Sequence, residues 1–192
     1  MKEISRCGWS VSDPVYIDYH DRDWGVPVRE DPKQFEFLVL ESAQAGLSWL
    51  TILKRREGYR RLYAGFDVEQ VARFDHMRVE QMMQDTGIIR NRKKIESSIN
   101  NAQRFLEIQD LHGTFCSYLW GFVEGKQVVN HFKELAEIPA TTPLSDTIAK
   151  DLKQKGFRFL GSTIIYAHLQ ATGLVNDHLT SCFRHRECIV ST

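Results

Sequence analysis

The chain has 192 residues, of which 42% are hydrophobic, so it is long enough to bury the core of one compact domain without disulfide bonds. Its 25 lysines and arginines balance its 25 aspartates and glutamates, which argues against a protein that coats nucleic acid through its overall charge. The sequence has no apolar stretch that reaches membrane-span length and no signal-peptide pattern at its start, so we expect a cytoplasmic protein without a membrane partner.

The charges are unevenly distributed along the chain. Residues 1–50 carry five basic and nine acidic side chains, whereas residues 51–100 carry eleven basic and seven acidic ones. The second segment is therefore the candidate anion-binding face, although such runs are also typical of solvated helix faces. Four cysteines without a dense framework fit a reducing compartment, where cysteine is more often a metal ligand or a buried apolar residue than a disulfide partner.

The first 30 residues contain two possible metal ligands, Cys7 and His20. They could share one ion with His178 and Cys182, which are four residues apart and would face the same way on a helix. By spacing alone, the alternative remains that the cysteines are small buried hydrophobes and the histidines are ordinary core or surface residues. Flat aromatic side chains that could stack on a base lie around Glu41 and His20 in the sequence: Trp9, Tyr16, Tyr19, Trp24 and Trp49.

Asp31-Pro32 is the clearest helix start, because it combines an N-cap residue with proline at the first helical position. It predicts an apolar helix that ends near Gly46, and a second helix is predicted from Ser48. Glu41 lies in the middle of the first helix. Since a buried glutamate seldom lacks a partner, it either pairs with an arginine or is kept in a pocket for a ligand.

Asp67 and Gln70 resemble a capping box for a short helix. The following segment, residues 79–106, has the pattern of two helices joined by a tight turn at Gly87, with the basic run 90–94 at the start of the second helix. Backbone N–H groups at such a helix start can hold a phosphate. Plain helical hairpins share this outline.

The remaining segments also have helical period. Helices are predicted at about 115–122, at 144–155 after Thr142-Pro143, and through 164–169. The sequence has no internal repeat and no long linker, so it predicts an all-α fold with one domain over residues 1–192. It contains no nucleophile elbow, P-loop, dinucleotide fingerprint or H-E-x-x-H motif.

Five motifs together resemble those of the 3-methyladenine DNA glycosylase I family, a bacterial, zinc-containing branch of the helix-hairpin-helix DNA glycosylases. They follow one another in family order from about residue 6 to residue 182. The motifs are Arg-Cys-Gly-Trp at 6–9, Tyr-His-Asp-Arg-Asp-Trp-Gly-Val-Pro at 19–27, Glu-Ser-Ala-Gln-Ala-Gly-Leu-Ser-Trp at 41–49, Gly-Ile-Ile-Arg-Asn-Arg-Lys-Lys-Ile at 87–95 and Gly-Leu-Val-Asn-Asp-His at 173–178.

The resemblance implies a helix-hairpin-helix glycosylase fold in which residues of about 1–30 and 160–192 form a zinc-binding lobe. It implies one structural Zn²⁺ per chain, held by Cys7, His20, His178 and Cys182. Four protein ligands close the coordination shell, which argues against a zinc hydrolase or deaminase with a metal-bound water.

The resemblance also implies the site residues. Glu41 matches the base-contacting glutamate and is the candidate catalytic residue, and Tyr19 and Trp49 match the aromatics that line the base pocket. Gly46 and Leu47 match the tip that enters the duplex. The implied DNA-backbone anchor consists of Gly87, Ile88, Arg90, Arg92 and Lys93. Ser42 and Ala43 stand where a well-known member of the family carries a glycine and a polar residue, a change that could reshape the pocket wall.

The function implied is base-excision repair: a monomeric enzyme flips 3-methyladenine out of double-stranded alkylated DNA and hydrolyses its N-glycosidic bond. The chain shows no counterpart to the aspartate of other helix-hairpin-helix glycosylases and no lysine in the lyase position, so the enzyme is expected to be monofunctional and to leave an abasic site. The alternatives are a non-catalytic zinc-containing module that binds alkylated DNA, and a zinc-stapled interaction domain without a nucleic-acid role.

Overall fold

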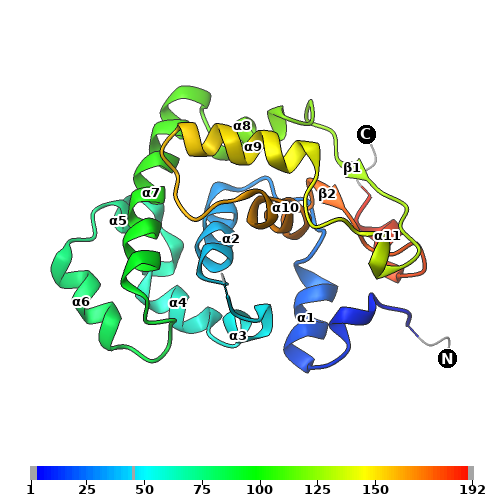
Figure 1. Ribbon diagram of the computed structural model, residues 1–192, viewed down its shortest axis with the longest axis horizontal. Coiled ribbons are helices and arrows are strands. Elements are labelled where there is room, and N and C mark those ends of the chain that lie inside the picture. Colours follow the sequence, from blue (N-terminus) through cyan, green and yellow to red (C-terminus); the bar gives the residue numbers. More distant parts are fainter. Residues whose placement is uncertain (1–3, 45, 190–192) are drawn as a thin grey trace.

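Figure 1 shows the computed structural model, which describes residues 4–44 and 46–189. Three helices form the centre of the molecule. Helix α2 (Asp31–Gln44) contacts both the long helix α7 (Arg92–His112) and α10 (Ser162–Ala171). Because α2 is covered on several sides, every residue from Gln34 to Ala43 is buried, which explains its largely apolar sequence.

Shorter elements surround these three helices. The α-helices are α1 (Pro14–Arg22), α3 (Trp49–Leu53), α4 (Arg56–Leu62), α5 (Val68–Ala72), α6 (His76–Gln84), α8 (Phe115–Gly121), α9 (Pro143–Gln154) and α11 (Phe183–Glu187). The 3₁₀ helices are η1 (Gly8–Ser10), η2 (Ala64–Phe66) and η3 (Leu135–Glu137), and the strands are β1 (Val128–Val129) and β2 (Val175–Asn176).

Side-chain caps fix three of the helix starts that the sequence predicts. The side chains of Ser48, Asp67 and Thr142 each accept a hydrogen bond from the backbone N–H three residues later, at 3.2, 3.0 and 3.1 Å. These bonds satisfy N–H groups that have no partner within the helix. The predicted starts of α3, α5 and α9 are confirmed.

Asp31 has a different role from the predicted N-cap. It is the first residue of α2, and its carboxylate accepts hydrogen bonds from the backbone N–H groups of Phe115 and Cys116, each at 2.8 Å. Asp31 therefore caps α8 across the core. The sequence could not indicate this role, because 84 residues separate Asp31 from Phe115.

The buried side chains form two clusters on either side of α2. The larger cluster includes Phe35 and Leu38 of α2 together with Phe105 of α7 and Phe115 of α8. The smaller one joins Phe37 of α2 to residues near both ends of the chain: Cys7, Tyr19, Trp24, Leu53, Ala171, Leu179 and Cys182. Helix α2 thus connects the main helical core to the region where the N- and C-terminal segments meet.

The predicted all-α class is confirmed, since the fold is mostly helical. One small departure is a parallel pairing of β1 with β2, in which Val128 faces Val175 and Val129 faces Asn176. It holds the segment after α8 against the C-terminal segment. Within residues 4–44 and 46–189, no helix has both the length and the apolar character that crossing a membrane requires.

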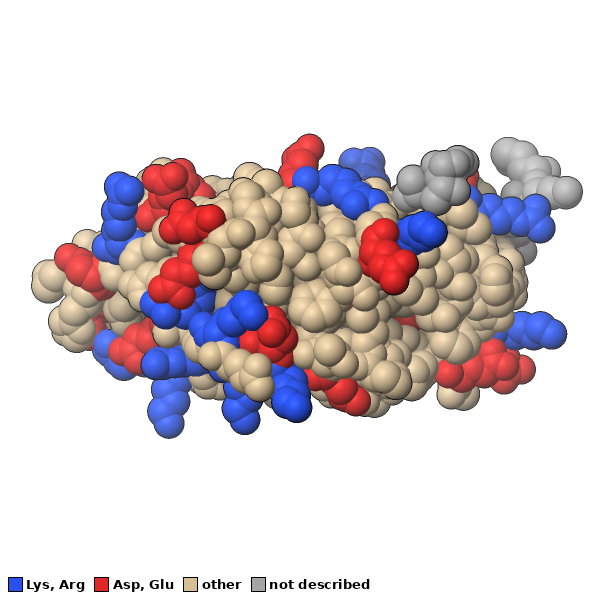
Figure 2. Space-filling model, turned by 90° about the horizontal axis from the view of Figure 1, so that it is seen from above, with Lys and Arg blue, Asp and Glu red and all other residues tan. Residues whose placement is uncertain are grey.

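Figure 2 shows the molecule from above, the side on which α8 and α9 lie in Figure 1. Acidic and basic side chains lie next to one another on this face, around a broad uncharged area. A surface of mixed sign attracts a polyanion weakly. This side of the molecule is therefore a poor match for DNA.

Candidate active site and metal centre

A cavity of about 420 Å³ lies between α1, α2, α3 and α10. Its lining is mostly aromatic and aliphatic: Trp9, Tyr16, Tyr19, Trp24, Glu41, Gln44, Trp49, Leu135, Ile138, Ala167 and Gln170. A concave, apolar site with few polar groups is the usual form of a small-ligand pocket. The predicted base-pocket residues Tyr19, Glu41 and Trp49 all lie on its wall.

The aromatic side chains of the cavity contact one another edge to face. The Tyr19 and Trp49 rings lie 5.6 Å apart, and Trp9 lies 5.6 Å from Tyr16 and 5.0 Å from Trp24. The Tyr16 hydroxyl also accepts a hydrogen bond from the backbone N–H of Leu50 at 3.1 Å. These contacts fix rigid, flat walls, which suit a planar heterocycle.

Glu41 is the acidic side chain of the cavity and is only 2% exposed. Its Oε2 lies 2.8 Å from Nδ1 of His168, whereas its Oε1 has no hydrogen-bond partner among the residues described. Burial raises the pKa of Glu41, and the charge and hydrogen bond of His168 oppose that shift. An acceptor atom is therefore available to a ligand in the cavity.

The sequence prediction missed the partner of Glu41, because it treated the 164–169 segment only as an apolar helix. His168 is fully buried in α10. Its Nε2 lies 2.8 Å from Oε1 of Gln34 in α2. A histidine within an otherwise apolar helix was the available signal, and a buried polar side chain of this kind implies a hydrogen-bonding partner.

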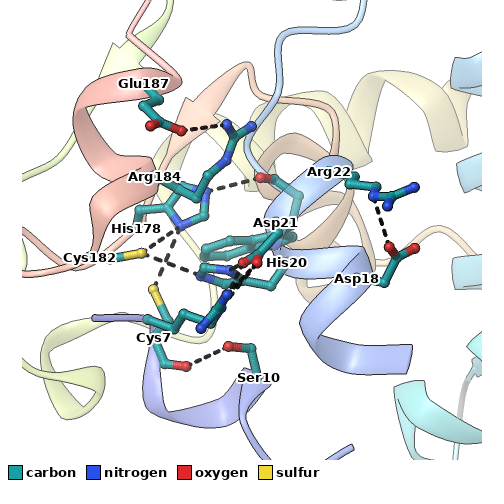
Figure 3. Close-up of polar contacts among 12 residues, drawn as sticks. Cys7, Ser10, Asp18, His20, Asp21, Arg22, His178, Cys182, Arg184 and Glu187 are labelled. Atoms are coloured by element: carbon teal, nitrogen blue, oxygen red, sulfur yellow. Dashed lines mark hydrogen bonds and ion pairs between the residues drawn. The ribbon is translucent and has the colours of Figure 1, made fainter. Parts of the chain in front are cut away.

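Cys7, His20, His178 and Cys182 come together in one buried group, with all ligand atoms within 4.8 Å of one another. Figure 3 shows their side chains converging from the two ends of the chain. The Cys182 Sγ lies 3.4 Å from Nε2 of His20 and 3.6 Å from Nδ1 of His178, and the Cys7 Sγ lies 3.7 Å from the same Nδ1. In a tetrahedral zinc site the ligand sulfur and nitrogen atoms are about 3.5 Å apart, so the group has the dimensions to hold a metal ion.

The outer nitrogen of each histidine is held by an acceptor. Nδ1 of His20 lies 2.8 Å from the Asp21 carboxylate, which also pairs with Arg6 at 2.7 Å, and Nε2 of His178 lies 3.0 Å from the Trp24 carbonyl oxygen. These acceptors place a proton on the outer nitrogen and leave the inner lone pair directed at the cysteines. Metal-binding histidines are oriented in the same way.

The buried thiols of Cys7 and Cys182 have pKa values that are shifted in opposite directions. Their mutual hydrogen bond and burial raise the pKa of Cys7. The hydrogen bond from Cys7 lowers the pKa of Cys182. A divalent cation bound to both sulfur atoms would stabilise them as thiolates.

One sequence prediction about this centre was wrong. His178 and Cys182 do not lie on a common helix: they occupy the loop between β2 and α11, and Cys182 precedes the first residue of α11. The Cys182 N–H donates to the Leu179 carbonyl oxygen at 2.8 Å, which closes a turn in this loop, and the Leu179 N–H donates to the Cys7 Sγ at 3.4 Å. The spacing of four residues is correct, but the local geometry comes from a turn.

The metal-ligand group is continuous with the cavity wall. The His20 ring stacks on Trp24, 6.1 Å away with an interplanar angle of 23°, and lies 5.5 Å from Trp9. Both tryptophans line the cavity. The ends of the chain therefore build one side of the pocket.

The predicted duplex-entering tip follows α2 directly. Gly46 and Leu47 are exposed, and Leu47 has 38% of its surface accessible. Gly46 has φ +80°, a backbone conformation that suits glycine. The tip precedes Trp49 of the cavity wall by only two residues, so an exposed apolar side chain stands beside the pocket.

The predicted DNA-backbone anchor forms a turn between α6 and α7. The Gly87 N–H donates to Asp85 Oδ1 at 2.7 Å, and the Ile89 N–H donates to the Tyr59 hydroxyl at 3.2 Å. The Ile88 side chain is buried in the larger core cluster, so only its backbone could meet DNA. Asn91 caps α7 by accepting from the Lys94 N–H at 3.2 Å.

Much of the basic segment is engaged in internal ion pairs. Arg56 and Arg60 both contact Glu36 at 2.8 Å, and Arg92 contacts Glu80 at 2.6 Å. Arg90 and Lys93 differ, because both are exposed and neither forms an ion pair within the described part of the chain. Of the predicted anchor residues, these two cations are available to a phosphate.

The comparisons with known proteins agree on one family. The profile of the methyladenine glycosylase family matches residues 9–185. The chain is 46% identical to DNA-3-methyladenine glycosylase 1 of Escherichia coli, over 93% of this chain and 96% of that protein. A crystal structure of 3-methyladenine DNA glycosylase I superposes with a TM-score of 0.90 at 47% identity, covering 93% of this chain and 98% of the other. The Staphylococcus aureus structure solved to explain 3-methyladenine recognition has a TM-score of 0.90 at 38% identity, with 93% and 95% covered.

Proposed function

The chain belongs to the methyladenine glycosylase family, and on that premise we propose that it is a monofunctional DNA-3-methyladenine glycosylase acting in base-excision repair. It hydrolyses the N-glycosidic bond of 3-methyladenine in alkylated DNA, releases the free base and leaves an abasic site. The enzyme would then be located in the compartment that contains the DNA, which in bacteria is the cytoplasm. We further propose that it acts as a monomer on double-stranded DNA.

The observation that carries this proposal is the unpaired Oε1 of Glu41 in an aromatic cavity. A base in a duplex cannot reach a buried carboxylate, so the nucleotide must leave the stack and enter the cavity. There, Tyr19 and Trp49 supply stacking faces, and Glu41 accepts a hydrogen bond from the base edge. An unpaired buried acceptor is costly without such a ligand.

The chemistry needs little from the protein beyond this recognition. N3-methylation gives the base a positive charge in DNA, which weakens its bond to the sugar. Water attacks the sugar carbon, the carbon–nitrogen bond breaks with its electrons moving to the base, and neutral 3-methyladenine leaves while the water loses a proton. Glu41 contributes a negative charge near the positive charge that develops at the sugar.

We assign one structural Zn²⁺ to Cys7, His20, His178 and Cys182. The donor set, its spacing and the two outer acceptors support this assignment. Zinc would neutralise two thiolates and hold the chain ends together. With four protein ligands it offers no position for a water, so the chain's own cavity residues carry the excision.

DNA binding is assigned to the two turns beside the cavity. The tip of Gly46 and Leu47 would fill the space that the flipped nucleotide leaves. The Gly87 N–H and the Ile89 N–H are held by Asp85 and Tyr59, so the Gly87 turn would meet the phosphate backbone mainly through the exposed side chains of Arg90 and Lys93. Arg92 would act indirectly, through its pairing with Glu80.

An excision assay tests the function. With methylated duplex DNA, the parent protein should release free 3-methyladenine, and Glu41→Gln should slow release by about a hundredfold to a thousandfold, the range for loss of one group that stabilises transition-state charge electrostatically. Glu69→Gln, which changes an exposed glutamate of α5, is the matched control and should be active.

Two outcomes would contradict the proposal. Binding of alkylated DNA without release of base would identify the non-catalytic module instead. An unchanged rate for Glu41→Gln would leave the enzyme activity intact but would refute the role of Glu41.

A further inference from the structure

His168 has an unusual pair of partners for a buried histidine. Its ring is inaccessible to solvent, and each ring nitrogen lies 2.8 Å from an oxygen atom: Nδ1 from Oε2 of Glu41, and Nε2 from Oε1 of Gln34. A neutral imidazole has only one N–H donor, so it could satisfy only one of these two acceptors. A doubly protonated ring satisfies both.

The orientation of the Gln34 amide decides between these two states. Gln34 is itself fully buried. Its Nε2 donates to the Val28 carbonyl oxygen at 3.4 Å. The amide also forms a hydrogen bond with the Cys116 thiol. Burial raises the pKa of this thiol, and the hydrogen bond with Gln34 lowers it. Both contacts favour the NH₂ group on the side away from His168. The amide oxygen therefore faces Nε2 of the histidine.

We propose that His168 is a positioning residue for base recognition: its doubly protonated ring holds the Glu41 carboxylate ionised and leaves Oε1 directed at the cavity as an acceptor. Gln34 stabilises the charged ring from the other side. The three side chains form a hydrogen-bonded chain in which His168 of α10 links Glu41 and Gln34, both of α2. None of the contacts among these three side chains was predicted from the sequence.

Because Glu41 is ionised, the cavity presents a hydrogen-bond acceptor to the ligand. What this means for base selection rests on the proposed function. An ionised carboxylate can only accept hydrogen bonds, so it favours a base edge that presents N–H groups, such as the exocyclic amine of adenine, and disfavours an oxo group. The other titratable group that faces Glu41 is Tyr19, whose pKa is raised by burial first and then by the Glu41 charge. Tyr19 therefore stays neutral and leaves His168 as the cationic partner of Glu41.

Nitrogen NMR of the His168 ring tests the charge state without any ligand. The full chain with its metal is used at neutral pH, and the His168 signals are assigned by their loss in His168→Phe. Both ring nitrogens should carry a proton in the parent protein. A ring with one unprotonated nitrogen would overturn the proposal.

Binding of free 3-methyladenine tests the positioning role through a double-mutant cycle. His168→Phe keeps the size of the ring but removes both donors, and it should weaken the affinity at least about tenfold, as expected for loss of a hydrogen bond to a charged group. In the Glu41→Gln background the same substitution should change the affinity less than about twofold. Equal losses in both backgrounds would show a purely structural effect and refute the role.

Two further variants sharpen the result. His168→Asn keeps one donor on the Nδ1 side and should recover part of the affinity. His112→Phe, in an exposed histidine at the end of α7, should bind like the parent. If the parent itself neither bound 3-methyladenine nor released it from DNA, the proposed function would fail, whereas the NMR spectrum would still decide the state of His168.

Discussion

The Glu41 carboxylate occupies a position that opposes folding and favours ligand binding. Burial raises its pKa, which means that its ionised form is less favourable in the folded protein than in the unfolded chain. Such a group stabilises the fold only below its unfolded pKa, and the contribution is lost as pH rises through the folded pKa. Ionisation of the carboxylate to which we assign base recognition therefore opposes folding as the pH rises.

We predict that the melting temperature of Glu41→Gln rises relative to that of the parent as the pH increases from about 3 to about 8, because only the parent has a buried carboxyl group that must ionise. This pH-dependent difference should vanish below about pH 4, the ordinary pKa of glutamate, because glutamate is then protonated in both states. Thermal melts across this pH range measure the effect.

Glu36, in the same helix, provides a control, because its pKa is shifted in the opposite direction to that of Glu41. Burial also disfavours its ionisation, but the hydrogen bond and charge of Arg56 outweigh burial and lower its pKa. Glu36→Gln should therefore destabilise the protein at pH 8, with the loss fading as pH falls. If both substitutions had the same sign, burial of Glu41 would not be the cause.

At the scale of elements, the backbone of α4 packs directly against the backbone of the α6–α7 turn. A Cβ atom on Gly58 would lie 2.1 Å from the carbonyl oxygen of Gly87, so only glycine fits at this position in α4. The neighbouring Arg61 pairs with Asp85 at 2.9 Å. Helix α4 thus supports the turn that we assign to the DNA backbone.

Gly58→Ala should force this turn to move. We expect a loss of about 1–3 kcal/mol in the free energy of unfolding, typical of an overpacked site, together with weaker DNA binding. Gly121→Ala is the matched control, because a Cβ at Gly121 would meet nothing within 4 Å. Chemical denaturation and a DNA-binding titration measure the two effects, and equal stability of both variants would contradict the close approach.

The turn itself offers a test of its electrostatic role. Arg90→Ala and Lys93→Ala should each weaken DNA binding regardless of sequence and should each reduce the slope of log K against log salt by about one. Lys150→Ala is the control, since Lys150 is exposed on α9, which lies at the opposite edge of the molecule from this turn in Figure 1. An unchanged salt slope in the Arg90 and Lys93 variants would move the DNA contact elsewhere.

At the scale of the whole molecule, sequence reasoning succeeded where the signals are local. Caps such as Ser48 and Thr142 act over three residues, so they fixed the helix starts. The motif resemblance, rather than spacing, justified combining Cys7 and His20 with His178 and Cys182. Asp31 and His168 were misread or missed because their partners lie far away in sequence, at Phe115 and Glu41, and only the packing of α8 and α10 against α2 brings them together.

At the same scale, the proposed metal ion would influence the cavity through the two ends of the chain. The four ligands join residues 7–20 to residues 178–182, and His20 contacts Trp24 and Trp9 of the cavity wall. The smaller core cluster, which contains Cys7 and Cys182, also includes Tyr19. Loss of the ion would leave two thiolate ligands and two imidazoles buried without a cation, which loosens this cluster and with it one side of the pocket.

We therefore predict that metal removal acts on the cavity through the chain ends. Cys182→Ser should reduce the metal content from one ion per chain to nearly none, and should lower stability by several kcal/mol, or roughly 10 °C in melting temperature. Binding of 3-methyladenine should weaken in parallel, while the helical circular dichroism signal at low temperature changes little, because neither α7 nor the larger core cluster contains a metal ligand. Cys116→Ser, in a buried cysteine of α8 beside Asp31, keeps a hydroxyl that can donate to the same carboxylate and should retain the metal. Retention of one ion per chain by Cys182→Ser would refute the ligand assignment, and loss of metal without any loss of base affinity would separate the metal centre from the pocket.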